Sequence, residues 1–583
     1  MQNYFSDDNI IFELAKIRAK LSRKRHNNYF FERIVQDSTI EGNSFQNLLS
    51  KILPPRNQWK RPAFKRRLTK DSHQINIYSI VITVRHFRSL PFRKQPAWVA
   101  ELNAFIRQIQ VDALYERQID LIPPTIIPVS KDKKEAGIAL YRPISVFKEL
   151  RTKILISIFS KYLMDKLDPL FSNSSFAFRR GKVYKGSIPT HHNCIEEIVQ
   201  FKKDKKNIFV SECDIRSFFD IISHREILYS YDIFKNRLWV EKREKIDRRA
   251  DLFLKSFLET YSIEYAMKES NTYFETSNIH GKLALPIEGL IERFYSKSDE
   301  KLKDIGVPQG AELSTLIANM ILHDCDVAME SNYKSQDFLY MRFCDDMIVL
   351  SSSKKKAALA FEEYTRILSR KKLLYHEDSP LLPYTDSKSK KDFWNRKSRK
   401  AFHWSMEAYP WLSFVGYNIR EDGHVRIRKS SIRKEFDKQV FIVDKVLGAI
   451  RAAIIEGEQH RIRNNHFSIF ERVKSRLYSM SVGRISLKRN YSDSQISWIG
   501  GFQGIFIFEK VFRNRLKDLD RSRSRNLARL KSYLKLVMKD NSSKASSQES
   551  KSKESFSYLG LPFSYYSNSK NQIANKSSKE SIR

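Results

Sequence analysis

The chain has 583 residues, too many for one ordinary domain, and 41% of them are hydrophobic, which is enough for several buried cores. Its 105 Lys and Arg residues outnumber 67 Asp and Glu residues, and the resulting net charge of +38 favours a polyanionic partner such as nucleic acid. No apolar run approaches the ~18 residues of a membrane-spanning helix, and the four cysteines are too far apart for a disulfide framework, so we expect a cytoplasmic protein with no membrane partner.

Residues 1–115 are expected to form a helical and basic N-terminal extension. Within them, Lys51–Lys70 carries eight basic residues and no acid. Aromatic side chains among cations suit stacking on bases beside neutralised phosphates. The stretch therefore predicts nucleic-acid binding, with a solvated basic loop as the alternative. The candidate contacts are Trp59, Lys60, Arg61 and Phe64.

Residues 116–430 alternate between strand-like and helix-like patterns. The stretch "LIPPTIIPVSKDKKEAGIALYRPISV" predicts two strands around a basic turn, and "FKELRTKILISIFSKYLMDKL" predicts an amphipathic helix. The stretch "NIFVSECDIRSFFDII" predicts a strand interrupted by acids, and Leu313–Met329 predicts a long helix that precedes two more strands. Strands mixed with helices indicate an α+β fold class.

Asp345 and Asp346 lie side by side between two strand-like runs, in "YMRFCDDMIVLSSS". Adjacent carboxylates repel each other, and their burial is costly unless a cation compensates. Asp214, in "FVSECDIRSFFDIISH", supplies a third acid after another strand. Carboxylates on neighbouring strands suit two Mg²⁺ ions about 3.5–4 Å apart, with Mn²⁺ as an alternative. The alternative is that Asp345 and Asp346 belong to an ordinary turn between two strands, with no metal bound.

A glycine-containing turn lies between these acids, in "GVPQGAELSTLIANMIL". Gly306 and Gly310 allow the backbone of this turn to approach a ligand closely. Gln309 between them can both donate and accept hydrogen bonds without carrying a charge. The 95 residues from Asp214 to Gln309 predict an insertion around residues 230–300.

In this order, the three stretches resemble motifs A, B and C of the reverse transcriptases. Three further stretches agree with that family. "YRPISVFKELRTKIL" resembles its finger strand and helix, "SSFAFRRGKVYKG" with "THHNCIEEI" resembles a segment of group II intron and other prokaryotic members, and "WLSFVGYNI" resembles the primer grip. The resemblance covers about residues 120–430. It implies a right-hand polymerase, with fingers and palm built on antiparallel sheet and a helical thumb.

The resemblance implies a metal site and a nucleotide site. Asp214, Asp345 and Asp346 would be the catalytic carboxylates that hold the metal ions. Ile215, the residue after Asp214, would belong to both the metal site and the nucleotide site.

Four more residues take implied roles in binding substrates. Arg142 would hold the incoming triphosphate, with help from a lysine among Lys131, Lys133 and Lys134. Gln309 would pack near the nascent base pair. Phe219 would be the steric gate under the sugar, where a bulky aromatic side chain excludes a 2′-hydroxyl. Gly416 of the primer grip would contact nucleic acid.

Two positions depart from the pattern of the family. Phe343 stands where motif C usually has tyrosine. Ser379 stands about where the family often has the lysine thought to protonate pyrophosphate, and His376 or a displaced lysine is the candidate substitute. The basic stretch at residues 387–404 is a candidate contact for template RNA.

The remaining chain is expected to be helical and basic, followed by a tail. We expect a helical thumb and basic C-terminal extension over residues 431–540. Its last part, Gly501–Asp540, holds eleven basic residues against four acids and favours RNA binding, with a solvated helix face as the alternative. The last 43 residues, 541–583, include fourteen serines and are expected to be disordered.

Among reverse transcriptases, the chain most resembles the stand-alone, defence-associated enzymes of prokaryotes, which are related to group II intron and retron enzymes. The resemblance implies an RNA-directed DNA polymerase that uses dNTPs, copies an associated noncoding RNA into DNA and acts against phage. A homo-oligomer is an open option. A retron-like or domesticated intron enzyme and an RNA-binding scaffold with a vestigial site are the alternatives, whereas Phe219 disfavours an RNA-templated RNA polymerase.

The priming mode stays open between RNA, DNA and a protein tyrosine. The tail contains three tyrosines, Tyr558, Tyr565 and Tyr566. Anchoring of the tail by these aromatic side chains is the favoured interpretation.

Overall fold

The computed structural model describes residues 1–32, 34, 46–63, 72–184, 188–203, 205–295, 299–482, 510–539 and 565. The chain divides into two compact units. The first unit comprises residues 1–14, 43–53 and 90–415, and the second unit comprises residues 15–42, 54–89 and 416–583. The domain limits expected from the sequence stay a prediction.

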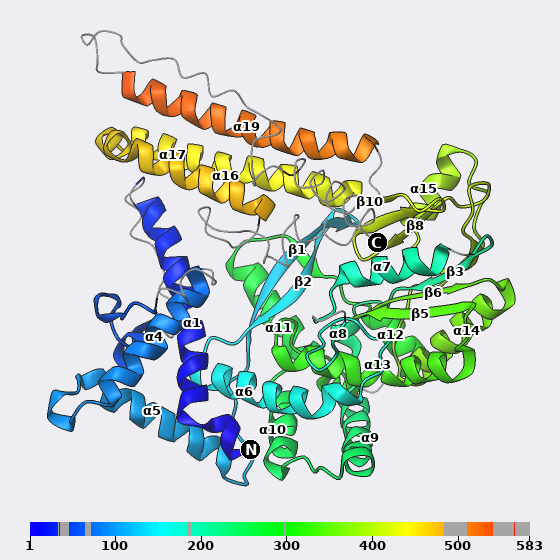
Figure 1. The fold of residues 1–583 in the computed structure, drawn as a ribbon, viewed down its shortest axis with the longest axis horizontal. Coiled ribbons are helices and arrows are strands. Elements are labelled where there is room, and N and C mark those ends of the chain that lie inside the picture. The colour runs from blue at the N-terminus through cyan, green and yellow to red at the C-terminus, as the bar shows by residue number, and fades with distance from the viewer. Residues whose placement is uncertain are drawn as a thin grey trace, which may run out of the picture. The chain divides into compact units, whose positions relative to one another are not determined.

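The first unit contains both helices and strands (Figure 1). Its helices are α2 (Gln46–Ile52), α5 (Ala97–Leu114), α6 (Leu150–Leu167), α7 (His191–Lys202), α8 (Phe218–Ile221), α9 (His224–Lys242), α10 (Arg248–Glu259), α11 (Ile263–Thr276), α12 (Ile287–Phe294), α13 (Glu312–Tyr333), α14 (Lys354–Arg370) and α15 (Ser387–Asn395). Its strands are β1 (Thr125–Glu135), β2 (Ile138–Val146), β3 (Phe209–Cys213), β4 (Gly281–Leu283), β5 (Phe338–Phe343), β6 (Asp346–Ser351), β7 (Arg399–His403) and β8 (Trp411–Phe414).

A four-stranded antiparallel sheet, in the order β5-β6-β3-β7, carries the predicted carboxylates. β5 and β6 form a hairpin in which Phe343 pairs with Asp346, so its two-residue turn is Cys344–Asp345. β6 also pairs with β3, and Asp214 follows β3 directly. The register therefore brings Asp214 beside the hairpin turn. The strands expected on either side of the two adjacent acids are confirmed.

Two helices pack against this sheet and against each other. α14 contacts β3, β6 and β7, and α13 contacts α14, α6 and α9. The buried residues of α14 recur three or four positions apart, as in a helix with one apolar face toward the sheet. The helices expected from the sequence are confirmed in α6 and in α13, which begins one residue before Leu313 and ends four residues after Met329.

A buried ion pair fastens the β5–β6 hairpin to α13. Arg342, next to the last residue of β5, donates to Asp326 Oδ1 at 2.8 Å and to Oδ2 at 2.6 Å, and both side chains are fully buried. The Arg342 guanidinium also donates to the carbonyl of Cys344 at 2.9 Å and to Asn319 Oδ1 at 3.1 Å. Tyr340 donates a further hydrogen bond to Asp326 at 2.7 Å. The ion pair and its hydrogen bonds therefore fix the position of the hairpin turn.

The predicted finger hairpin is confirmed, but its basic residues are placed differently. β1 and β2 are antiparallel, and the turn between them is Ala136–Gly137, with Gly137 at φ +83°. The expectation of a basic turn is therefore wrong, since Lys131, Lys133 and Lys134 belong to β1, where the register shifts. β4 extends this sheet by pairing in parallel with β2. The segment where an insertion was expected contains helices α9 to α12.

The second unit is mainly helical among its described residues. It contains α4 (Ser72–Arg88), β9 (Tyr417–Arg420), β10 (Val425–Ile427), α16 (Lys429–Ile455), α17 (Gln459–Val482) and α19 (Lys510–Lys539), whereas α1 (Asp7–Glu32) begins in the first unit and ends in the second. α16, α17 and α19 pack against one another, as Figure 1 shows in yellow and orange. Their core includes Val443, Leu447, Ile450, Leu477 and Leu530. The expectation of a helical region after residue 430 is confirmed for the described residues.

Tyr565 from the C-terminal tail is buried in the second unit. Its backbone N–H donates to Asp520 Oδ1 at 3.0 Å, and its hydroxyl donates to Glu435 Oε1 at 2.7 Å. Burial, reinforced by the charge of Glu435, raises the pKa of Tyr565 well above its usual value. This contact matches the favoured anchoring interpretation at Tyr565, whereas Tyr558, Tyr566 and the rest of 541–583 lie outside the described residues. Among the described helices, none is both long and apolar enough to cross a membrane.

The Arg342–Asp326 pair predicts a large loss of stability when one partner is removed. Arg342→Ala should lower the free energy of unfolding by about 3–5 kcal/mol, because Asp326 would stay buried without its counter-charge. Denaturant unfolding followed by tryptophan fluorescence measures the change. The matched control is Arg366→Ala, which removes an arginine that is 60% exposed and should cost less than about 1 kcal/mol. Equal losses in the two variants would contradict the assignment.

Candidate active site

Asp214 is held at the end of β3 by its own backbone. Its N–H donates to Ser398 Oγ at 3.2 Å, and its carbonyl accepts from the N–H of His376 at 2.9 Å. The side chain is 18% exposed, and its Oδ2 lies 3.1 Å from Lys397 Nζ and 3.6 Å from His376 Nε2. A predicted metal carboxylate therefore faces a lysine and a histidine.

Asp345 occupies the β5–β6 hairpin turn, near Asp214. Burial raises the pKa of Asp345 above its usual range, the negative charge of Asp214 adds to the rise, and Lys397 opposes it. The preceding residue, Cys344, has a left-handed backbone at φ +60°, which lets the chain reverse within two residues. The two carboxylates are thus close enough to repel each other, and Lys397 compensates part of that repulsion.

The chemistry of this carboxylate pair suits a divalent cation. Carboxylate oxygens are the ligands that Mg²⁺ prefers, and a dication would offset both negative charges. Asp346 begins β6 and is exposed, and Ile215 is buried and pairs with Tyr375. Among the residues that the structure describes, no group of three or more His, Cys, Asp or Glu side chains is arranged to hold a metal ion. The structure brings Asp214 and Asp345 together, and the roles of Asp346 and Ile215 stay predictions.

The predicted nucleotide residues come from three elements of the first unit. Phe219 lies in α8, half-buried beside the ring of Phe218 at 5.4 Å between centroids. Gln309, in the turn before α13, donates from Nε2 to Asp220 Oδ1 at 2.7 Å. Arg142 is exposed on β2. Burial raises the pKa of Asp220, and the positive charges of Lys131 and Arg142 oppose that rise, so the finger hairpin and α8 face a common region.

Sequence reasoning missed two charged residues near these positions. Lys397 is 183 positions from Asp214 and stands in the basic stretch that we assigned to template RNA. Asp220 follows Phe219 in an apolar run, where its acidity was the one available signal. Neither contact with its partner could be derived from local spacing, because both depend on the tertiary fold.

Ser379 stands about where the family often has a lysine, and two nearby residues are candidates to replace that lysine. Ser379 accepts a hydrogen bond on its carbonyl from Arg396 at 2.5 Å, so its segment is fastened to the residue before Lys397. His376 and Lys397 both lie near Asp214 Oδ2, at 3.6 Å and 3.1 Å. Both substitutes named from the sequence, a histidine and a displaced lysine, therefore stay open.

The remaining predicted contacts with nucleic acid belong to the second unit. Trp59 donates from Nε1 to the carbonyl of Pro54 at 3.0 Å, and the backbone of Lys60 bonds to Thr83 of α4 at 2.8 Å. The side chains of Lys60 and Arg61 are exposed. Gly416 has φ +91° in the turn before β9. The fourth candidate of the basic stretch, Phe64, lies outside the described residues.

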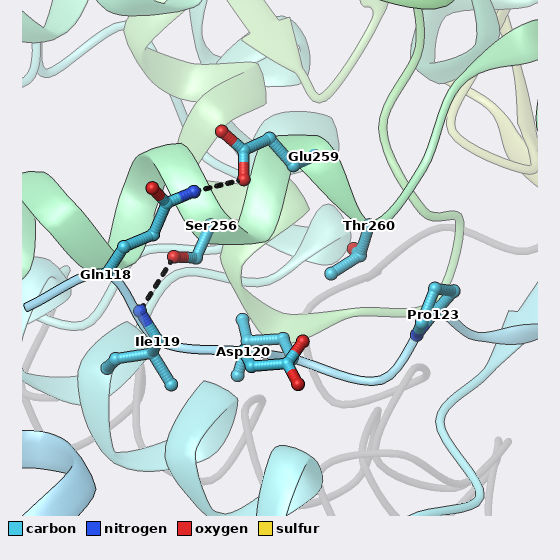
Figure 2. Close-up of a pocket in the computed structure, with 8 residues that line it drawn as sticks. Gln118, Ile119, Asp120, Pro123, Ser256, Glu259 and Thr260 are labelled. Carbon is cyan, nitrogen blue, oxygen red and sulfur yellow. Dashed lines mark hydrogen bonds between the residues drawn. The ribbon is translucent and has the colours of Figure 1, made fainter.

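A cavity of about 370 Å³ also lies in the first unit, and none of the predicted site residues lines it (Figure 2). Its lining is Gln118, Ile119, Asp120, Leu121, Pro123, Ser256, Glu259 and Thr260. Gln118 donates to Glu259 at 2.5 Å, and the N–H of Ile119 donates to Ser256 at 3.1 Å. With two acids and no basic residue in its lining, the cavity does not suit a nucleotide triphosphate.

Comparison with protein-family models decides the class. Residues 131–378 match the model described as reverse transcriptase (RNA-dependent DNA polymerase). The chain contains a reverse transcriptase domain. This match confirms the predicted enzyme class, RNA-directed DNA polymerase, and the predicted polymerase fold. The reverse transcriptase domain includes Asp214, Gln309 and Asp345 and ends before Lys397.

Solved telomerase structures share a general likeness with the chain. The telomerase of Candida tropicalis with a TWJ fragment of telomeric RNA is 11% identical, with 81% of this chain and 76% of that chain covered and a TM-score of 0.32. The apo telomerase of the same species is 13% identical, with 80% and 76% covered and a TM-score of 0.32. The telomerase of Candida albicans is 13% identical, with 80% and 73% covered and a TM-score of 0.29. Scores this low support no assignment of site, substrate or partner. No curated protein matches the chain.

The repulsion between Asp214 and Asp345 predicts that the melting temperature of the protein depends on a divalent metal ion. Because the pKa of Asp345 is raised in the folded state, its ionisation destabilises the fold increasingly as pH rises through the window above the usual carboxyl pKa. At pH 7 in chelator, Asp345→Asn should therefore melt at a higher temperature than the wild type. Mg²⁺ should raise the melting temperature of the wild type more than that of the variant. Differential scanning fluorimetry measures both, and a variant that melts lower in chelator would contradict the electrostatic account.

Proposed function

We propose that this chain is a metal-dependent reverse transcriptase that copies an associated noncoding RNA into DNA and acts in defence against phage. The observation that carries the catalytic part is that Asp214, directly after β3, lies close enough to Asp345, in the β5–β6 turn, for its charge to add to the cost of ionising Asp345. The net charge of +38 supports a nucleic-acid template and product. The choice of template and the antiviral role are supported by the sequence resemblance to stand-alone, defence-associated enzymes.

The residues in and around this carboxylate pair have separate roles in nucleotide addition. Asp214 and Asp345 would hold the divalent cations, with Asp346 and the carbonyl of Ile215 as further ligands. When bound, Mg²⁺ ions in such a site lower the pKa of the attacking hydroxyl and stabilise charge on the transferring phosphate. Lys397 compensates the carboxylate charge at 3.1 Å from Asp214.

The residues of the finger hairpin and α8 would hold the nucleotide itself. Arg142, exposed on β2, suits a triphosphate because its guanidinium can donate two parallel hydrogen bonds to phosphate oxygens. Phe219 places an aromatic ring under the sugar, so a 2′-hydroxyl would lack both space and a hydrogen-bond partner. Together, these roles make deoxynucleotides the substrate.

Two other functions remain as alternatives to the proposal. A retron-like or domesticated intron enzyme would share the chemistry and differ in its RNA. An RNA-binding scaffold with a vestigial site would need no facing carboxylates, so the retained charge cost at Asp345 argues against it. A homo-oligomer stays a prediction that mass measurement in solution can test.

Sequencing of co-purified nucleic acid tests the function and names the template. RNA should co-purify with the wild type and with Asp345→Ala, whereas DNA complementary to that RNA should be lower by roughly a thousandfold in the variant, since carboxylate ligands support several kcal/mol of charge stabilisation. Asp337→Ala, which removes an exposed acid outside the site, is the matched control and should keep the DNA. Equal DNA in all three proteins would refute the catalytic role of Asp345. RNA without DNA in the wild type, in infected and uninfected cells alike, would favour the scaffold.

The steric-gate role predicts a change in sugar selectivity. Phe219→Ala should reduce the preference for dNTPs over rNTPs by roughly 10- to 100-fold, because the ring that fills the space of the 2′-hydroxyl is gone. Single-nucleotide primer extension with matched dNTP and rNTP gives the ratio of kcat/KM values. Tyr229→Ala on α9, which removes a 60% exposed aromatic side chain, should leave the ratio unchanged. An unchanged ratio in Phe219→Ala would move the gate elsewhere.

A further inference from the structure

Asp220 is a buried carboxylate that no role above uses. It lies in α8 directly after Phe219, and the residue is 4% exposed. Its Oδ1 accepts a hydrogen bond from Gln309 Nε2 at 2.7 Å. A buried acid of this kind needs a compensating partner, and here the partner is the amide predicted to lie near the nascent base pair.

The backbone on both sides of this hydrogen bond is locked together. The N–H of Val307 donates to the carbonyl of Phe219 at 2.8 Å, and the N–H of Gly306 donates to the carbonyl of Ile222 at 2.8 Å. Gly306 has φ +98°, and a Cβ there would come within 3.1 Å of both the Asp220 carbonyl and the ring of Tyr261. The turn before α13 therefore lies directly against α8.

The same turn is also fastened to the finger hairpin. The N–H of Ser145, on β2, donates to the carbonyl of Gln309 at 3.0 Å. The main chain of Gln309 is thus fixed by β2, and its side chain is fixed by Asp220. What stays variable is which end of the amide faces away from Asp220.

We propose that Asp220 is a positioning residue for the nucleotide site, because its carboxylate sets which end of the Gln309 amide, carbonyl or amino, is presented to the incoming nucleotide. This inference rests on the proposed nucleotide role of Gln309. An ionised carboxylate can only accept, so it binds the amino end of the amide and leaves Oε1 free. A protonated carboxyl can donate to Oε1 instead, and the amide can then turn over and present its amino group.

The surroundings of Asp220 make both protonation states accessible at neutral pH. Burial raises the pKa of Asp220 to about 7, against the opposing effects of the Gln309 hydrogen bond, Lys131 and Arg142. Tyr261 is a further titratable group that interacts with Asp220, and its own pKa lies well above the usual value because it is buried. When Asp220 is ionised, the Gln309 amide keeps the orientation seen in the structure. At lower pH, Asp220 is protonated and the amide is free to turn over.

The experiment is the pH dependence of single-nucleotide addition on an RNA template between pH 6 and pH 8.5. In the wild type, the KM for dNTP should rise by roughly fivefold as pH falls through 7, the worth of one hydrogen bond. Asp220→Asn keeps the size of the side chain and its ability to bond the amide, but it does not titrate. In this variant the KM should vary less than about twofold over the same range.

Two further variants decide whether the effect belongs to the Asp220–Gln309 pair. Gln309 is half-buried, so Gln309→Met should fold, and it should also lose the change of KM around pH 7. Glu259→Gln is the matched control, because Glu259 likewise accepts from a glutamine amide, that of Gln118 at 2.5 Å, and lies outside the predicted site. That control should keep the wild-type pH profile.

The outcomes separate this inference from the function on which it rests. If the KM of Asp220→Asn or of Gln309→Met changes around pH 7 as much as the KM of the wild type, the positioning role is overturned and the polymerase function is not. An active wild type with no change of KM around pH 7 would overturn it as well. A wild type without RNA-templated DNA synthesis would instead refute the proposed function.

Discussion

The buried pair between Arg342 and Asp326 is the interaction on which the site depends. Through it, β5 is fixed to α13, and the same guanidinium holds the carbonyl of Cys344 at the hairpin turn. Asp345 follows that carbonyl directly, so its position is set by an ion pair that water cannot reach. Such a pair is costly to assemble, since two charges lose their hydration, and it is much costlier to break on one side. The result is a rigid turn that can hold the carboxylate of Asp345 near the carboxylate of Asp214.

The same logic of compensated charge extends through the rest of the site. Asp214 and Asp345 repel each other and are partly neutralised by Lys397. Asp220 is buried near Lys131 and Arg142 and bound by Gln309. Each of these acids would be unfavourable alone in the interior. Acids held at such a cost beside exposed cations are typical of sites that bind metal ions and phosphates.

Much of the fold and part of the site could be predicted from the sequence. The strands around Asp345 and the helices α6 and α13 follow from local apolar spacing, which is a property of short segments. The meeting of Asp214 with Asp345 followed from the order of the motifs and not from spacing. Lys397 was missed because its partner is 183 residues away, and Asp220 because a buried acid in an apolar run has no local signature of its partner.

The division into two units could not be predicted for a related reason. Residues 54–89 belong to the same compact unit as α16 and α19, although several hundred residues separate them in the chain. Tyr565 is likewise held by Glu435 and Asp520, which are remote in sequence. Composition marked the tail as polar and Ser-rich, and it could not indicate that one tyrosine of that tail would be buried.

The most direct measurement is primer extension on a defined RNA template by the purified protein, titrated with Mg²⁺, beside Asp345→Asn in the same assay. The account predicts DNA products whose yield rises with Mg²⁺ in the wild type, with none above background in the variant, while both proteins bind the RNA template with equal affinity. DNA synthesis by Asp345→Asn at the wild-type rate, or synthesis by the wild type that is indifferent to divalent ions, would contradict it.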